Sequence, residues 1–472
     1  MTSEQVLDIF KLITAIPRES GHEEPMTQFL CDWAAARNLE CRKDETGNVC
    51  IIREAAKGKE NIPAIALQAH QDMVCEKLAG VEHDFRRDPI KYEIEDGWMI
   101  AKQTTLGADD GIGVAACLAL LESEAPTGKI ECLFTISEET GMDGAFALQP
   151  GFFDAKVLIN LDSEDEGQLF IGCAGGEHTD ARFKYESEAL ADAGLCLELS
   201  ISGGAGGHSG DDINKHRANT VHILASFLAK CGLPYRLVSF EGGGKHNTIA
   251  RECKVVLACA DAGISAKFDA YAQEIKKEYA KDDPALVFEC RKIAPVASAI
   301  EDKVAKALIS ALASCPHGVL KMSPDIEGLV QTSSNLAAVV MEKPGIVRVN
   351  TSQRSSVVAE LDEAVLKVSA NFADAGAYVE NYGKYPGWKP NVNSHLLKVC
   401  VDSYRKLFDE DPLVLAIHAG LECGLFLEKF PDLDMISFGP TLRGVHTPGE
   451  KLELASMDRF VELLDDVVCN YR

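Results

Sequence analysis

The sequence predicts an α/β fold, in which a domain with a mainly parallel sheet is built from both chain ends and is interrupted by an inserted α+β domain. Three observations support this prediction. Short apolar runs alternate with helical segments in residues 1–183, the alternation is lost in residues 184–389, and it resumes in residues 390–472. Such alternation is typical of a parallel sheet covered by helices. The turn-rich segment 385–390 marks the end of the insertion.

Each element follows from local periodicity. Apolar residues from Val6 to Ile16 recur at helical spacing behind a capping box of Thr2 and Gln5, and so predict a first helix. Residues 62–67, 132–136 and 157–161 are expected to be strands, and 111–121 a buried helix. In the insertion we expect strands at 195–201, 254–260 and 345–351 and helices at 214–231, 267–280, 298–314 and 362–374. In the tail we expect a helix at 394–408, strands at 413–417 and 435–438, and a last helix.

Composition limits the classes of partner. The chain has 472 residues and a formal charge of −26, which argues against nucleic acid or an anionic membrane as partner. No apolar stretch approaches membrane-spanning length, and the N-terminus lacks the pattern of a signal peptide. The 16 cysteines form no CxxC pair, so we expect a reduced, cytosolic protein.

Polar side chains follow three of the expected strands. In an open α/β sheet, ligands bind beyond the carboxyl ends of the strands. Two more groups lie in glycine-containing turns, the pair Asp109–Asp110 before the buried helix and His446 in the tail. The strand-end residues are His70 and Asp72, the adjacent pair Glu138–Glu139, and Asp162.

These residue types suit a metal-assisted hydrolase. Imidazole nitrogens and carboxylate oxygens bind zinc, and also manganese or cobalt. Two histidines, one bridging carboxylate and two terminal carboxylates would hold two ions about 3.5–4 Å apart, and a water shared between them would supply hydroxide near neutral pH. If one of two adjacent glutamates binds metal, the other can move the proton. Asp72 can accept the second N–H of the His70 imidazole.

Each element alone has a simpler explanation. Adjacent glutamates often form a solvated face, and Asp109–Asp110 could cap the helix that follows. The segment 111–116 also fits the G-x-G-x-x-A form of a dinucleotide-binding motif. That interpretation fails because no apolar strand directly precedes the motif and two aspartates would face the pyrophosphate.

Several motifs in chain order resemble those of the M20 metallopeptidases. The resemblance is greatest to the aminoacyl-histidine dipeptidase (cytosolic nonspecific dipeptidase) branch, and it covers nearly the whole chain. The motifs are HQDMV at 70–74, LGADDGIG at 106–113, SEETGM at 137–142, NLDSE at 160–164, GCAGG at 172–176, GGHSG at 206–210, IHAGLECG at 417–424 and GP at 439–440.

The resemblance implies a role for each matching residue. Glu138 would be the general base, Asp72 the partner of a ligand imidazole, and His208 a stabiliser of the oxyanion. Asp110 stands where this branch often has asparagine, so either aspartate could bridge the ions, and we favour Asp109. The implied metal ligands are His70, Asp109, Glu139, Asp162 and His446, and the implied substrate contacts are Asn247 and Arg354. His418 is a further candidate for substrate binding, at the floor of the cavity.

The resemblance also implies an activity and an assembly. Residues 1–183 and 390–472 would form the catalytic domain, and 184–389 a lid. The expected enzyme is a homodimeric dipeptidase with two divalent ions, zinc before cobalt or manganese, that hydrolyses Xaa-His and other dipeptides. The alternatives are an N-acyl amino acid deacylase, a di-zinc aminopeptidase, or a catalytically silent binding protein. The pair Glu138–Glu139 argues against the last, because a binding protein has no need of a spare base.

Overall fold

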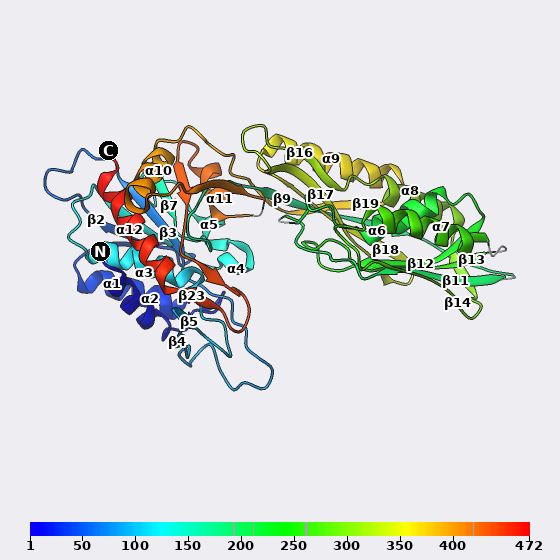
Figure 1. Ribbon diagram of the computed structural model, residues 1–472, viewed down its shortest axis with the longest axis horizontal. Coiled ribbons are helices and arrows are strands. Elements are labelled where there is room, and N and C mark those ends of the chain that lie inside the picture. The colour runs from blue at the N-terminus through cyan, green and yellow to red at the C-terminus, as the bar shows by residue number, and fades with distance from the viewer. Residues whose placement is uncertain (192–193, 211, 260–262, 419) are drawn as a thin grey trace. The chain divides into compact units, whose positions relative to one another are not determined.

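The chain folds into two units, which are described separately. The computed structural model describes residues 1–191, 194–210, 212–259, 263–418 and 420–472 (Figure 1). The first unit comprises Met1–Gly172, Pro390–Ala416 and Leu421–Arg472, and the second comprises Cys173–Lys389 and Ile417–Gly420. The first boundary thus falls after Gly172 instead of at the expected 183. The reason is that β9 (Gly175–Lys184) pairs along its length with β18 (Ile346–Ser355).

The first unit contains an eight-stranded mixed sheet of order β1-β2-β6-β3-β7-β21-β8-β20. Its middle strands β6, β3, β7 and β21 are parallel, as expected for an α/β fold. The flanking strands β1, β2 and β8 pair antiparallel. For β1 and β2 the reason is the short turn between them, which leaves no room for a crossover. The bounds are β1 (Glu40–Lys43), β2 (Val49–Arg53), β6 (Ile130–Thr135), β3 (Ile65–His70), β7 (Val157–Asn160), β21 (Asp434–Ser437), β8 (Gln168–Cys173) and β20 (Leu413–Ile417).

Helices pack around this sheet. The capping box predicted for α1 (Ser3–Ile13) is present, with both Thr2 and Gln5 accepting a backbone N–H from the other. α3 (Ala108–Glu122) is apolar on every side, and it packs against β3 and α1. The remaining helices of this unit are α2 (Glu24–Ala36), α4 (Glu138–Gly141), α5 (Asp143–Ala147), α10 (His395–Phe408), α11 (Glu422–Lys429) and α12 (Leu454–Asn470).

The second unit has the expected α+β character. Its antiparallel sheet has the order β14-β11-β13-β12-β17-β18-β9-β19, with β16 beside β17. The expected strand 254–260 is β13, and residue 260 lies outside the described residues. The expected helix 298–314 begins only at Asp302, because residues 298–300 form β15. The bounds are β10 (Ser187–Ala189), β11 (Leu195–Ser202), β12 (Tyr235–Gly243), β13 (Cys253–Cys259), β14 (Val287–Lys292), β15 (Ser298–Ile300), β16 (Gly318–Met322), β17 (Val330–Lys343), β19 (Tyr378–Tyr385), α6 (Thr220–Lys230), α7 (Gly263–Glu278), α8 (Asp302–Ser314) and α9 (Val358–Asp374).

Within the described ranges, no helix has both the length and the apolar character required to cross a bilayer.

Candidate metal centre

The carboxyl ends of three parallel strands bring the predicted residues to one edge of the first unit's sheet. β3 ends at His70, which is paired with Thr135 at the end of β6. The pair Glu138–Glu139 follows β6 and begins the short helix α4. Asp162 follows β7, and its Oδ1 lies 3.6 Å from His70 Nε2. Parallel pairing therefore places one imidazole and several carboxylates side by side.

Asp109 lies between the two histidines. Its Oδ1 is 2.9 Å from His70 Nε2, and its Oδ2 is 3.1 Å from His446 Nε2. The same His446 nitrogen is 2.9 Å from Glu139 Oε1. Asp109 is in the first turn of α3, whereas His446 lies between the paired strands β22 (Leu442–Arg443) and β23 (Lys451–Glu453). The carboxylate of Asp109 thus joins residues that are more than 300 positions apart.

The potential ligand atoms fall into three groups, in each of which all atoms lie within 4.8 Å of one another. One group is His70, Asp109 and Asp162, and another is Asp109, Glu139 and His446. The third contains His70 with both Glu138 and Glu139. Because Asp109 belongs to two of the groups, the arrangement offers two adjacent ion positions with a common carboxylate.

Asp72 contacts both sides of this cluster. Its Oδ1 lies 3.3 Å from His70 Nδ1, the nitrogen that faces away from Asp109. The two oxygens also accept the backbone N–H groups of Glu138 (3.1 Å) and Glu139 (3.3 Å), and Ser20 Oγ donates to Oδ2 at 2.7 Å. One buried carboxylate therefore orients an imidazole and the adjacent glutamates together.

Asp110 belongs to none of these groups and bonds backbone groups instead. Its Oδ2 accepts the backbone N–H of His70 at 3.3 Å, and its Oδ1 accepts the N–H of Gly113 at 3.2 Å. A Cβ atom at Gly113 would overlap this carboxylate, so a glycine is needed there. The two adjacent aspartates thus make different contacts.

The second unit gathers the other predicted residues. His418 Nε2 lies 2.8 Å from Ser333 Oγ, and Ser333 is the cross-strand partner of Arg354. A Cβ atom at Gly210 would overlap the carbonyl oxygen of His418 and lie 3.1 Å from His208 Cε1, so these histidines flank that glycine. Asn247 lies next to this group, because its carbonyl oxygen accepts the N–H of Ser209 at 2.8 Å. Residue 419, in the tail motif, lies outside the described residues.

Comparison with known proteins identifies the family. Residues 66–470 match peptidase family M20/M25/M40. The chain belongs to this family. It is 36% identical to the cytosol non-specific dipeptidase of Escherichia coli over 474 aligned residues, which cover 99% of this chain and 98% of that protein.

Solved structures agree with this assignment. Aminoacylhistidine dipeptidase from Vibrio alginolyticus is similar with a TM-score of 0.93 and 38% identity, over 98% of this chain and 96% of that one. Aminopeptidase PepT from Bacillus cereus has a TM-score of 0.59 and 17% identity, over 99% and 98% of the two chains. At that identity the second likeness concerns the fold alone.

The donor set of this M20 peptidase fits divalent metal ions. Two imidazoles and three carboxylates converge, and such a mixture suits zinc and its neighbours in the first transition row. In the metal-free protein, the carboxylates favour the protonated, positively charged form of both imidazoles. Hydrogen bonds to Asp109 and Glu139 raise the pKa of His446 to about 11. Burial lowers the pKa of His70, but Asp162, Asp109 and Asp72 outweigh it and raise the net value well above the usual range.

For Glu138 and Asp162, burial is the largest influence and raises the pKa of the carboxyl group. It raises the pKa of Glu138 well above the usual range, and the charge of Asp162 adds to the effect. The pKa of Asp162 rises to about 7, again chiefly through burial. Burial would also raise the pKa of Asp72, but hydrogen bonds from His70 and Ser20 hold it below its usual value. Glu138 can therefore keep a proton where Asp72 cannot.

Three buried charged residues near the centre were not predicted from the sequence. Arg18 and Glu450 bond the backbone of loops that carry potential ligands. Glu422 accepts from Gln68 Nε2 (2.7 Å) and Thr135 Oγ1 (2.9 Å) below the strand ends, and burial raises its pKa to about 8. Glu422 and Glu450 do lie in the quoted or neighbouring motifs, but nothing local in the sequence indicates their partners.

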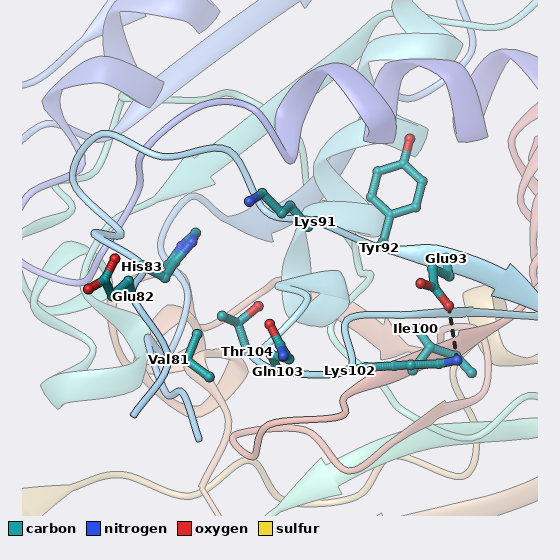
Figure 2. A pocket seen from close by; sticks show the side chains of 10 residues that line it. All are labelled: Val81, Glu82, His83, Lys91, Tyr92, Glu93, Ile100, Lys102, Gln103 and Thr104. Atoms are coloured by element: carbon teal, nitrogen blue, oxygen red, sulfur yellow. Dashed lines mark ion pairs between the residues drawn. The ribbon is translucent and has the colours of Figure 1, made fainter. Parts of the chain in front are cut away.

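A separate cavity of about 350 Å³ lies in the first unit, between residues 81–93 and 100–104 (Figure 2). Lys102, in its wall, forms ion pairs with Glu93 at 2.9 Å and Glu95 at 2.8 Å. None of the lining residues belongs to the ligand groups. We therefore assign this cavity no part in the chemistry.

Proposed function

We propose that this M20 peptidase is a dipeptidase that uses two divalent metal ions, zinc before cobalt or manganese. One observation carries the proposal: the carboxylate of Asp109 faces both His70 and His446 and is common to two groups of potential ligands. His70 and Asp162 would complete one ion position, and Glu139 and His446 the other, with Asp109 bridging. When bound, the ions would supply a nucleophile at neutral pH and polarise the scissile carbonyl.

Glu138 would move the proton. It belongs to a group of potential ligands with His70 and Glu139, so its carboxylate lies beside the reacting atoms without being needed as a ligand. The bond from its backbone N–H to Asp72 holds it in place, and its raised pKa suits a group that takes a proton and returns it to the leaving amine.

Residues of the second unit would bind the peptide. Arg354 is buried, its Nη1 donates to Tyr385 OH at 3.0 Å, and its Nε has no hydrogen-bond partner. Among the residues that the structure describes, none forms an ion pair with Arg354, so its guanidinium is available for the carboxylate of a substrate. We further propose that His208 stabilises the oxyanion and that Asn247 and His418 contact the substrate.

The names of two relatives support dipeptides as the substrate class. Both the Escherichia coli and the Vibrio alginolyticus proteins are called dipeptidases, and the latter name refers to aminoacylhistidine. We therefore propose Xaa-His and other dipeptides as substrates, the cytosol as the location, and a homodimer as the assembly. An N-acyl amino acid deacylase or an aminopeptidase of the same family remains the alternative.

Substitution of the proposed base tests the mechanism. Glu138→Gln should lower kcat by about 10²–10⁴-fold while the metal content stays unchanged, because the variant loses only proton transfer. Glu54→Gln, at an exposed position of the same unit, is the matched control and should retain full activity. A Glu138→Gln enzyme that binds metal and turns over at the normal rate would exclude Glu138 as the base.

A substrate panel tests the activity. Carnosine-like and ordinary dipeptides should give higher kcat/KM values than N-acetyl amino acids, which lack a free amine. The reverse order would replace the dipeptidase by a deacylase.

A further inference from the structure

Glu450 accepts hydrogen bonds from four consecutive backbone N–H groups. Its Oε2 accepts those of Leu106 (2.7 Å) and Gly107 (2.9 Å), and its Oε1 accepts those of Ala108 (2.7 Å) and Asp109 (3.3 Å). The Glu450 side chain is buried, with 2% of the residue exposed. These N–H groups precede or begin α3, where the helix itself offers them no acceptor. One carboxylate thus satisfies the whole run that ends at Asp109.

Arg18 holds the same loop from its carbonyl side. Its Nη2 donates to the carbonyl oxygen of Gly107, and its Nη1 donates to those of Asp72 (2.7 Å) and Gln71 (3.2 Å). Gly107 has a φ of +69°, and a Cβ atom there would overlap Arg18 Nη2. The backbone N–H of Gly107 therefore donates to Glu450, and the backbone carbonyl oxygen of Gly107 accepts from Arg18.

The two buried charges connect three of the segments that carry potential ligands. Arg18 joins the loop after His70 to residues 106–109, and Glu450 joins residues 106–109 to the segment of His446, four positions before it. Removing the carboxylate would leave several buried N–H groups without an acceptor, which is unfavourable for every group that stays unsatisfied. The loop would move to regain partners, and Asp109 would move with it.

We propose that Glu450 is a positioning residue for the metal centre, which fixes the Asp109 carboxylate between His70 and His446 through the backbone of residues 106–109. The inference rests on the proposed metal-dependent function. Because Asp109 would bridge both ions, a displacement of its backbone should weaken the binding of both.

The test compares Glu450→Gln with Glu131→Gln. Glu131 is the matched control because it is also buried in the first unit, and its Oε2 accepts the backbone N–H groups of Asp154 (2.9 Å) and Ala155 (2.7 Å), away from any ligand. A glutamine keeps one acceptor oxygen but turns an NH₂ group toward the backbone donors. Both variants should lower the Tm. Glu450→Asp, which keeps the charge on a shorter side chain, serves as a second variant if Glu450→Gln does not fold.

Two measurements decide the role. In metal-free protein, amide hydrogen exchange of residues 106–109 should be at least tenfold faster in the Glu450 variant than in wild type and unchanged in Glu131→Gln. Zinc affinity from chelator competition should fall about 10–100-fold for the Glu450 variant only, with a lower kcat at saturating zinc and an unchanged KM for a dipeptide.

Three outcomes would overturn the proposal. The first is unchanged exchange at residues 106–109, and the second is wild-type zinc affinity in a folded Glu450 variant. The third is an equal loss of affinity in Glu131→Gln, which would show a general effect of stability. A wild-type protein that binds none of zinc, cobalt and manganese would refute the metal-dependent function itself, and the exchange experiment would still report whether Glu450 holds the loop.

Discussion

Metal affinity should rise steeply with pH, well above the range in which free histidine titrates. In the metal-free centre the imidazoles of His70 and His446 each face carboxylates, which raise both pKa values, that of His446 to about 11. His446 is 48% exposed, so solvent screens part of this effect, but half of the upward shift would still leave it protonated at pH 7. A metal ion needs the neutral imidazole and must displace these protons.

The magnitude follows from the number of protons displaced. With two protons released, the overall association constant for both ions increases about 100-fold per pH unit, or about 10⁴-fold from pH 6 to pH 8. The carboxyl of Asp162, with a pKa of about 7, adds a third proton at the acid end of this range. Metal affinity must rise with pH, because the metal-free protein binds these protons and the metal-bound protein does not.

Chelator competition between pH 7.5 and pH 8.5 separates this expectation from an ordinary site. Histidines with the usual pKa of about 6.5 are neutral throughout that interval and would give a nearly constant affinity. Calorimetry in two buffers of different ionisation enthalpy should independently count about two released protons. A flat affinity in this interval would refute the reasoning.

Two variants provide the internal check. His446→Asn should reduce the slope to about tenfold per pH unit, because one titrating ligand is removed. His395→Asn, at an exposed histidine of the same unit, should leave the slope unchanged.

Two further predictions concern stability. Gly107→Ala should lower the free energy of unfolding by about 1–3 kcal/mol more than Gly97→Ala does. Both glycines have a positive φ, but only at Gly107 would the added methyl group overlap a side chain. Urea unfolding measures the difference between the two variants, and equal losses of stability would contradict the prediction. Burial lowers the pKa of His317 to about 3, so as the pH falls below 6.5 the unfolded chain takes up a proton that the folded chain does not. The advantage of wild type over His317→Gln should then shrink by at most about 1.4 kcal/mol per pH unit, measured by unfolding at several pH values, and a growing advantage would contradict it.

The edge of the sheet at which the potential ligands gather could be predicted because it depends on local sequence pattern. Buried parallel strands such as β3, β6 and β7 appear as mostly apolar runs, and their carboxyl ends lie together in any parallel sheet. The expected strand 62–67 was three residues too early, since β3 extends to His70 itself. The shift does not matter for the site, because His70 still lies at the end of the strand.

Contacts between distant residues could not be predicted in this way. Glu450 lies 344 positions from Leu106, and no periodicity relates a buried carboxylate to a run of N–H groups in a remote loop. The polar residues 331–335 of β17 are buried as well, so the apolar pattern that identifies a strand is missing there. The sequence placed the first domain boundary at residue 183 instead of after Gly172 for a related reason. β9 belongs to the second unit because it pairs with β18, and its composition does not reveal that partner.

The pair Asp109–Asp110 shows how contacts separate two residues that are equivalent in sequence. Asp110 offers one oxygen to each of two backbone donors, at His70 and Gly113, which a single amide oxygen of asparagine could not match in the same way. Burial and the charge of Asp162 raise its pKa well above the usual range, so it contributes less negative charge to the centre than an exposed aspartate would. Asp109 has both oxygens directed at imidazoles instead. These contacts favour Asp109 as the bridge and give Asp110 the separate task of holding the loop against the end of β3.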